Sequence, residues 1–178
     1  MRLRLRCERG FGLVELLMAI VMLNIGILAI VMAFDSGMFA LKRASRISTA
    51  TSLADAQMEL YRALPYASIA LASSSIPVTA PYTTDTAYSA TQVTGSCGSP
   101  LPNECNASRT VSNTTNPASP DHKSYRVDTY IVLSSATTNP PTPPNGRPVK
   151  IVTIVVRDGY KLTATLVREV STFDQSTG

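Results

Sequence analysis

The feature that most constrains this chain is a long apolar run over residues 11–34, which carries a single carboxylate, Glu15. In a helix each residue rises about 1.5 Å, so this run covers roughly 36 Å. That length is enough to cross a bilayer core of about 30 Å with some tilt. The sequence therefore predicts a membrane-spanning helix near the N-terminus of the chain.

Glu15 is not a residue that a plain membrane anchor needs at this position. An ionised carboxylate within hydrocarbon is costly and normally has a specific partner. Cleavage between Gly10 and Phe11 would create that partner, because the new α-amino group is largely protonated at neutral pH. Glu15 lies four residues beyond Phe11, so the two charges could pair within one helix or between staggered neighbouring helices. If the pairing is between neighbouring helices, Glu15 would help separate copies of the chain to assemble.

The stretch GFGLVELLMAIVMLNIGILAI, with the basic leader over residues 1–10, resembles the N-terminus of type IV prepilins and type II secretion pseudopilins. The resemblance implies cleavage after Gly10 by a membrane-embedded aspartyl peptidase, the prepilin peptidase, and N-methylation of Phe11. It also implies that Glu15 pairs with the amine of a neighbouring subunit during assembly. The stretch LMAIVMLNIGILAI is most similar to PilV-like minor pilins, because major pilins usually carry a proline where this chain has Met32.

Two other interpretations of the N-terminal segment stay open. An uncleaved single-pass anchor would keep residues 1–10 and leave Glu15 without its amine. A secretory signal peptide usually has an apolar region of about 7–15 residues followed by its cleavage site, whereas here the cut precedes the run. Because positively charged residues stay cytoplasmic, we expect the C-terminal domain outside the cytoplasm, held by the bacterial inner membrane and later placed in a pilus or pseudopilus.

The chain beyond the span is expected to continue the helix. Residues 35–64 carry apolar side chains near helical spacing among charged ones, which predicts an amphipathic segment that Pro65 ends. Lys42, Arg43 and Arg46 follow the span closely. Contact with lipid headgroups and a solvated helix face account for these three residues equally well.

Residues 65–178 are expected to form one globular domain, since the roughly 140 residues that follow the span, the amphipathic helix included, suit a single small domain. Residues 73–123 are rich in Ser, Thr, Asn and Pro and are predicted to be mostly loop, with a short strand near residues 88–93. Residues 125–170 are predicted to form an antiparallel sheet. A long helix packed on such a sheet gives an α+β fold, which resembles the pilin fold.

Three strands are predicted in this sheet, over residues 125–133, 149–156 and 160–170, because they are rich in β-branched and aromatic residues. The Asp-Gly dipeptide at residues 158–159 suits a two-residue hairpin turn of type I′. The prolines of residues 139–148 lack N–H donors, so this stretch is expected to be an exposed loop.

The cysteines suggest an oxidising compartment. Cys7 lies in the leader, so processing would leave Cys97 and Cys105 as an isolated pair in a loop rich in Gly, Pro, Ser and Asn. A disulfide closing about nine residues contributes on the order of 2–3 kcal/mol in the chain-entropy model. A metal site is the alternative, but two thiolates without a nearby histidine make an incomplete set of zinc ligands. The disulfide is the favoured prediction.

The formal net charge of +4 does not indicate a nucleic-acid partner. The leader alone carries +3, from Arg2, Arg4, Arg6 and Arg9 against Glu8, which leaves +1 for the mature side chains. The positive charge therefore serves membrane topology.

The sequence carries no pattern typical of catalysis. There is no Gly-rich phosphate loop, nucleophile motif or acidic cluster with metal-ligand spacing, and the single histidine, His122, lies in a polar turn. The sequons at Asn106 and Asn113 are short patterns in a Ser/Thr-rich region and are assigned no function. We therefore expect a structural protein with no enzymatic activity, cofactor or metal.

The resemblance implies a minor structural subunit of a type IV pilus, with prepilin peptidase, other pilin subunits and the inner membrane as its partners. A minor pseudopilin of a type II secretion or DNA-uptake system shares the same N-terminal segment and stays an alternative. A membrane-anchored binding domain that is never cleaved is the third possibility. Cell adhesion through exposed loops is compatible with each of them.

Overall fold

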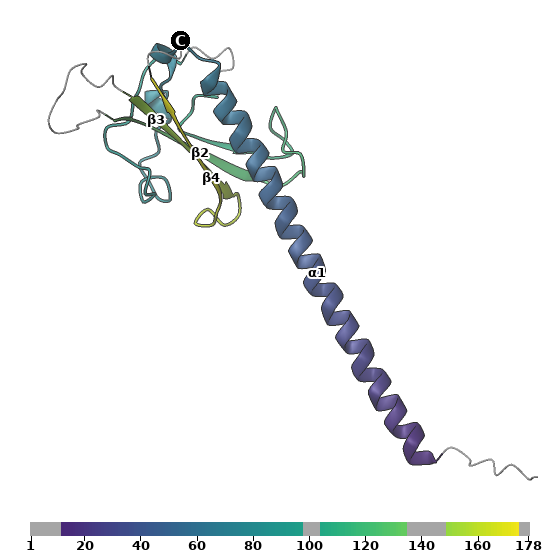
Figure 1. Ribbon diagram of the computed structural model, residues 1–178. Helices are drawn as coiled ribbons and strands as arrows, with labels where there is room; N and C mark the ends of the chain where they lie inside the picture. Colours follow the sequence, from purple (N-terminus) through teal and green to yellow (C-terminus); the bar gives the residue numbers. More distant parts are fainter. Residues whose placement is uncertain (1–11, 98–103, 135–148, 175–178) are drawn as a thin grey trace, which may run out of the picture. The chain divides into compact units, whose positions relative to one another are not determined.

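The computed structural model describes residues 12–97, 104–134 and 149–174 (Figure 1). The chain divides into two compact units, Met1–Ala44 and Ser45–Gly178. In the described residues the elements follow in the order α1 (Leu13–Arg62), the short 3-10 helices η1 (Tyr66–Ser68) and η2 (Ser73–Ser75), and the strands β1 (Ser108–Val111), β2 (Tyr125–Ser134), β3 (Val149–Asp158) and β4 (Thr165–Phe173). The α+β prediction is confirmed.

Helix α1 is a single element of 50 residues, and its ends lie within two residues of the predicted span of 11–64. The last turn closes where the N–H of Ala63 donates to the carbonyl oxygen of Glu59, at 3.0 Å. Pro65 then takes the position before η1, with an extended ψ of 146°. Proline has no N–H to continue the helical pattern, so the helix ends where the sequence predicts.

The first half of α1 is apolar on all sides. Every large apolar side chain within residues 13–34 is exposed in the structure. The helix has a mean hydropathy of 2.7 over its most apolar 18-residue window, so by length and composition it could cross a membrane or act as a signal sequence. A helix that is hydrophobic all round requires lipid or partner helices around it.

The second half of α1 has one buried face, which begins at Thr49. Its buried residues recur every three or four positions, as expected for one stripe of an amphipathic helix. The stripe consists of Thr49, Ala50, Leu53, Ala54, Gln57, Met58 and Tyr61. Met38 and Leu41, which the sequence pattern included, are exposed. The amphipathic segment is therefore shorter than the predicted one.

The four strands form one antiparallel sheet in the order β1-β2-β3-β4, so each strand pairs with its neighbour in sequence (Figure 1). Inward-facing residues of the central strands meet in register, for example Val127 with Val156 and Ile131 with Val152. These residues share one hydrophobic core with the buried stripe of α1. Helix and sheet thus bury their apolar faces against each other.

The predicted strands 125–133 and 149–156 are confirmed by β2 and β3. Strand β1 lies in the stretch predicted to be mostly loop. The sequence did not predict this strand, because its four residues are too few to show an alternating pattern. The strand expected near residues 88–93 is present only as an isolated bridge between Gln92 and Val132. The proline-rich loop at 139–148 lies outside the described residues.

The predicted two-residue hairpin at 158–159 is wrong. Strand β3 extends to Asp158 and β4 starts only at Thr165, so six residues connect them. A type I′ turn needs positive φ at both central residues, and none of the described glycines has it. Gly159 instead donates its N–H to the carbonyl oxygen of Ser124, at 3.0 Å. A Cβ at Gly159 would lie 2.6 Å from that oxygen, so glycine is required by close backbone approach.

We expect the substitution Gly159→Ala to destabilise the domain by about 1–3 kcal/mol, because the added methyl group forces the Ser124 backbone away from the hairpin. Denaturant unfolding of the full chain in detergent measures the effect. Thr163→Ala, at an exposed position of the same connection, is the matched control and should change stability by less than about 0.5 kcal/mol. Equal stability of the two variants would contradict the close-approach explanation.

Candidate functional site

The first turn of α1 places Glu15 at the N-terminal end of the apolar helix. The N–H groups of Glu15 and Leu16 both donate to the carbonyl oxygen of Gly12, at 2.9 and 3.2 Å, which closes this turn. A carboxylate here interacts favourably with the helix dipole. Glu15 forms no ion pair with the other described residues. The predicted cleavage and methylation positions, Gly10 and Phe11, lie outside the described residues.

Asn24 is the second polar side chain within residues 13–34, and the sequence analysis did not single it out. Its side chain is exposed on the apolar helix. Polar amides in transmembrane helices form hydrogen bonds across helix pairs. Asn24 therefore gives this helix a second polar contact point, nine residues beyond Glu15.

A shallow apolar groove follows on the surface of α1 around Gly37. It is lined by Ile30, Ala33, Phe34, Gly37, Met38 and Leu41. Apart from the adjoining residues and the backbone of the helix itself, nothing lies within 4 Å of the position that a Cβ of Gly37 would take. Small residues four positions apart, here Ala33 and Gly37, allow another helix backbone to approach closely. The first unit thus combines a carboxylate, an amide and a groove suited to helix packing.

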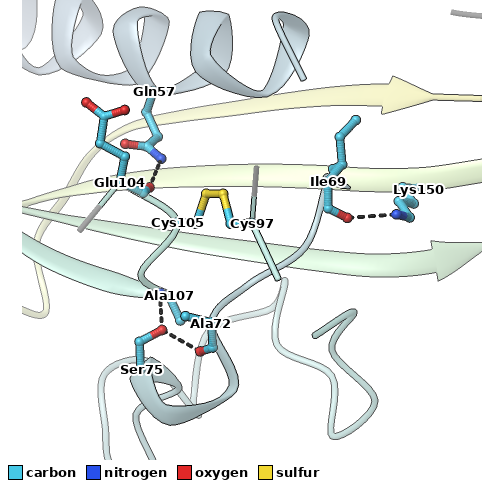
Figure 2. The surroundings of a disulfide bond; sticks show 9 residues. All are labelled: Gln57, Ile69, Ala72, Ser75, Cys97, Glu104, Cys105, Ala107 and Lys150. Carbon is cyan, nitrogen blue, oxygen red and sulfur yellow. Dashed lines mark hydrogen bonds between the residues drawn. A yellow bond between two sulfur atoms is a disulfide. The ribbon is translucent and has the colours of Figure 1, made fainter. Parts of the chain in front are cut away.

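In the second unit, Cys97 and Cys105 form a disulfide with a Cα–Cα distance of 6.1 Å, the arrangement favoured over a metal site (Figure 2). The chain around it is fixed to two other segments. The side chain of Gln57 on α1 donates to the carbonyl oxygen of Glu104, at 2.6 Å. The N–H of Ala72 donates to the carbonyl oxygen of Cys105, at 3.1 Å. The disulfide therefore joins Cys97 to a stretch, Glu104 and Cys105, that is hydrogen-bonded to α1 and to the segment before η2.

Lys150 is a buried cation that the sequence analysis missed. Its Nζ donates to the carbonyl oxygens of Tyr66 and Ile69, at 2.7 and 2.8 Å, and lies 4.5 Å from the centre of the Tyr66 ring. Burial lowers the pKa of this ammonium group from its ordinary value. These bonds hold η1 on the start of β3, so the role of Lys150 is structural.

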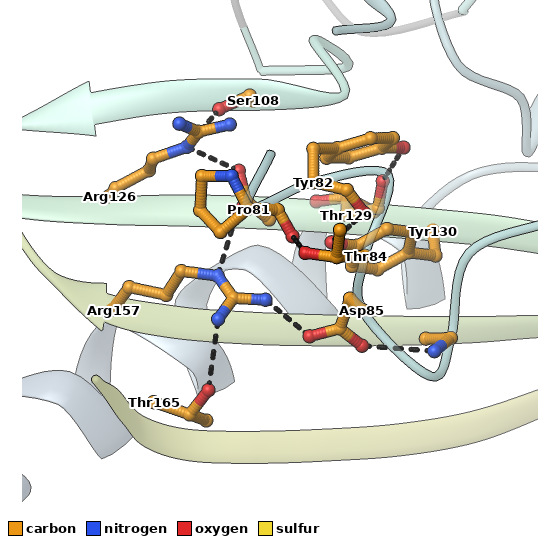
Figure 3. Close-up of polar contacts among 12 residues, drawn as sticks. Pro81, Tyr82, Thr84, Asp85, Ser108, Arg126, Thr129, Tyr130, Arg157 and Thr165 are labelled. Atoms are coloured by element: carbon orange, nitrogen blue, oxygen red, sulfur yellow. Dashed lines mark hydrogen bonds and ion pairs between the residues drawn. The ribbon is translucent and has the colours of Figure 1, made fainter. Parts of the chain in front are cut away.

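The face of the sheet that points away from α1 is called the outer face here. It carries a charge network that the segment around Asp85 covers, which consists of Asp85, Arg126, Asp128, Arg157 and Arg168. The guanidinium of Arg157 donates to the carboxylate of Asp128 at 2.9 Å. It also donates to the carboxylate of Asp85 (Figure 3). Arg126 donates to Asp128 at 2.8 Å, and Arg168 to Asp85 at 2.8 Å. The side chain of Asp128 is fully buried. Each buried carboxylate thus has two arginine partners.

Tyr82 places the segment that contains Asp85 against the same face of the sheet. Its ring stacks on that of Tyr130, with centroids 4.3 Å apart. The hydroxyl of Tyr82 donates to the carbonyl oxygen of Thr129, and the hydroxyl of Tyr130 donates to that of Tyr82. The polar stretch around residues 79–88 is therefore an ordered cover, and it contains neither helix nor strand, as its composition predicted.

The pKa of Asp85 is lowered from its ordinary value. Burial alone raises the pKa of this carboxyl. The hydrogen bond from the N–H of Ala87, the hydrogen bond and charge of Arg168, and the charge of Arg157 each lower the pKa, and together they outweigh the effect of burial. The unfolded chain therefore binds a proton at Asp85 at a higher pH than the folded chain does. Stability from this group is fully present above about pH 5 and is lost as the pH falls through its lowered pKa.

We expect Asp85→Asn to destabilise the domain by about 3 kcal/mol at neutral pH, because the buried Arg157 loses one carboxylate partner. The loss of stability between about pH 5 and pH 2 should also be smaller than in the parent chain. Urea unfolding across this pH range measures both effects. Glu59→Gln removes a carboxylate from an exposed pair and should cost less than about 0.5 kcal/mol. A pH profile of Asp85→Asn parallel to that of the parent would contradict the assignment.

The other chemically active side chains of the described ranges are dispersed. No group of three or more His, Cys, Asp and Glu residues among them is placed to hold a metal ion. His122 is exposed in a turn, with a φ of 58°. Asn113 is exposed, whereas Asn106 is half-buried. The features that stand out are therefore the N-terminal helix and the devices that order the domain.

Comparisons of the chain with protein-family models, with curated proteins and with solved structures found no match. The fold is therefore the feature that defines the class. A long N-terminal helix with an apolar first half, packed by its second half on a four-strand antiparallel sheet, is a pilin-like architecture. The disulfide-bonded loop is part of this pilin-like protein.

Proposed function

We propose that this chain is a minor structural subunit of a type IV pilus, made as a prepilin and cleaved between Gly10 and Phe11 by prepilin peptidase. The observation that carries the proposal is the composition of α1. One continuous helix has an all-round apolar half that starts at the turn of Glu15 and an amphipathic half that belongs to a folded domain. Such a helix suits a subunit that is stored in a membrane and later packs against other helices.

Glu15 is the proposed assembly residue. After cleavage, the N-methylated amine of Phe11 would be cationic and, in apolar surroundings, would need an anionic partner. The carboxylate of Glu15 in a neighbouring subunit supplies this charge and sets the axial register of the two helices. Asn24 and the groove around Gly37 support the same packing, since both favour contact between helices.

The domain is proposed to lie outside the cytoplasm of a bacterial cell. The disulfide between Cys97 and Cys105 suits an oxidising compartment. The basic residues of the leader favour a cytoplasmic N-terminus, which places everything after α1 on the other side.

A structural rather than catalytic role fits the domain. The buried carboxylates Asp85 and Asp128 are each neutralised by two arginines, so their charges are used to hold segments together. Lys150 is likewise engaged by carbonyl oxygens. These pairings support a subunit whose surface, and not a reactive centre, carries its function.

Intact mass and N-terminal peptide mapping of the chain, recovered from bacterial membranes with an active prepilin peptidase, test the processing. We expect a mature chain that starts at Phe11 and is heavier by one methyl group. The same chain from a strain without the peptidase is the control and should keep residues 1–10. An uncut N-terminus in the active strain would favour a membrane-anchored binding domain.

We expect Glu15→Val to leave membrane insertion intact and to lower the amount of the subunit in sheared filaments by at least about tenfold, because the buried amine of its neighbour loses its counter-charge. Leu16→Val, an apolar substitution in the same turn, should be incorporated normally. Quantitative immunoblots of membrane and filament fractions provide the measurement. Normal incorporation of Glu15→Val would contradict the assembly role.

A further inference from the structure

A pocket lies beside the edge strand β1 of the domain. Its volume is about 450 Å³, and it is lined by the four residues of β1 (Ser108–Val111), by Asn106 shortly before the strand and by residues 115–117 in the turn after it. Sites for small organic molecules usually have volumes of about 300–1,000 Å³. The pocket is therefore large enough for a small organic molecule and not only for a single ion.

Arg109 is the cation of this pocket, and it lacks a partner. The residue is half-buried, and its Nε atom is shielded from solvent and forms no hydrogen bond within the described residues. Each of the other described arginines of the second unit has a carboxylate partner. A buried polar or charged group without an acceptor is costly. A bound anion would supply the acceptor that the described chain does not.

The surroundings of the pocket leave the charge of Arg109 largely uncompensated. None of the described residues that line the pocket carries a carboxylate. Burial lowers the pKa of the Arg109 guanidinium, and the negative charge of Glu104 opposes this effect only in part. Arginine nevertheless stays protonated at neutral pH. The lining of the pocket therefore has a net positive charge, which favours an anionic ligand.

The backbone of β1 offers further donors. Strand β1 pairs with β2 alone, so it forms one edge of the described sheet. The N–H of Thr129 on β2 donates to the carbonyl oxygen of Ala107, at 2.8 Å, and in an antiparallel pair the bonded positions recur at every second residue. By this alternation the N–H groups of Ser108 and Thr110 point away from β2, towards the open edge of the sheet.

The side chains of the pocket suit a ligand with hydroxyl groups. The hydroxyl of Thr110 and the amide of Asn116 are exposed and have no hydrogen-bond partner among the described residues. The hydroxyl of Ser108 accepts a hydrogen bond from Arg126 at 2.9 Å, so it can still donate its own hydrogen. Hydroxyl groups of a sugar both donate and accept, and they therefore match amide and hydroxyl side chains.

We propose that this pocket binds an acidic sugar, whose carboxylate or phosphate group pairs with Arg109 and whose hydroxyl groups bind Thr110 and Asn116. A guanidinium forms paired hydrogen bonds with either of these anionic groups. The site depends on the folded domain alone, and not on cleavage, membrane insertion or membership of a pilus.

Titrations of the full chain test the proposal. The isotope-labelled chain is kept in micelles of lauryldimethylamine oxide, a detergent without carboxylate, phosphate or sugar, and its amide signals are followed by NMR. The probes are glucuronate and glucose 6-phosphate, with glucose, acetate and inorganic phosphate for comparison. The variants are Arg109→Gln and the control Arg62→Gln, which changes the charge equally. Arg62 lies 3.7 Å from Glu169 on β4, at the opposite edge of the sheet.

We expect at least one acidic sugar to shift the amide signals of β1 and to bind at least about tenfold more tightly than glucose, acetate or inorganic phosphate. The acidic sugar that binds more tightly shows whether the site prefers a carboxylate or a phosphate. Arg109→Gln should weaken this binding by at least about tenfold, whereas Arg62→Gln should leave it unchanged. Because Arg109 makes no hydrogen bond or ion pair within the described chain, Arg109→Gln should keep the urea unfolding midpoint of the parent.

Three results would overturn the proposal. Equal affinity of the parent and of Arg109→Gln for the acidic sugars would show that Arg109 does not hold the anion. Binding of acetate or inorganic phosphate as tight as that of the acidic sugars would show that no sugar body is recognised. A clear drop in the unfolding midpoint of Arg109→Gln without any probe would assign this arginine a structural role.

Discussion

The structure depends on one constraint: α1 must satisfy two surroundings within a single helix. Its first half exposes apolar side chains on every side, so water is a poor environment for it. Its second half buries only the stripe that begins at Thr49 and leaves charged residues such as Arg62 exposed. Because the backbone hydrogen bonds run through both halves, the change of environment needs no break in the helix. The domain is therefore joined to its apolar segment by continuous secondary structure.

The domain uses polar devices to order segments that have few apolar residues. Tyr82 and Asp85 hold one such segment on the outer face of the sheet, the disulfide holds a second, and Lys150 holds η1. The contacts of Tyr82, Asp85 and Lys150 join residues that are far apart in sequence and satisfy buried polar groups at the same time, whereas the disulfide joins two residues eight positions apart. Loss of a single partner would leave a charge or a carbonyl group unpaired, so the cover of the sheet is stable only as a complete set of contacts.

The functional groups are divided between the two units. The N-terminal unit carries Glu15, Asn24 and the groove around Gly37, which we propose to make contact with other helices or lipid. The domain carries an exposed surface whose loops are fixed from within. This division suits the proposed subunit, because an apolar helix would find similar surroundings in a membrane and among the packed helices of a filament.

The sequence by itself determined what depends on local pattern. It predicted the bounds of α1 to within two residues, the central strands β2 and β3, the Cys97–Cys105 pair and the position of Glu15, because periodicity, proline and spacing are local properties. Only the tertiary structure decided the short edge strand β1, the six-residue connection after Asp158 and the partners of Asp85. These features arise from contacts between distant segments, such as Gly159 against the Ser124 backbone, and no local pattern records which segments will meet.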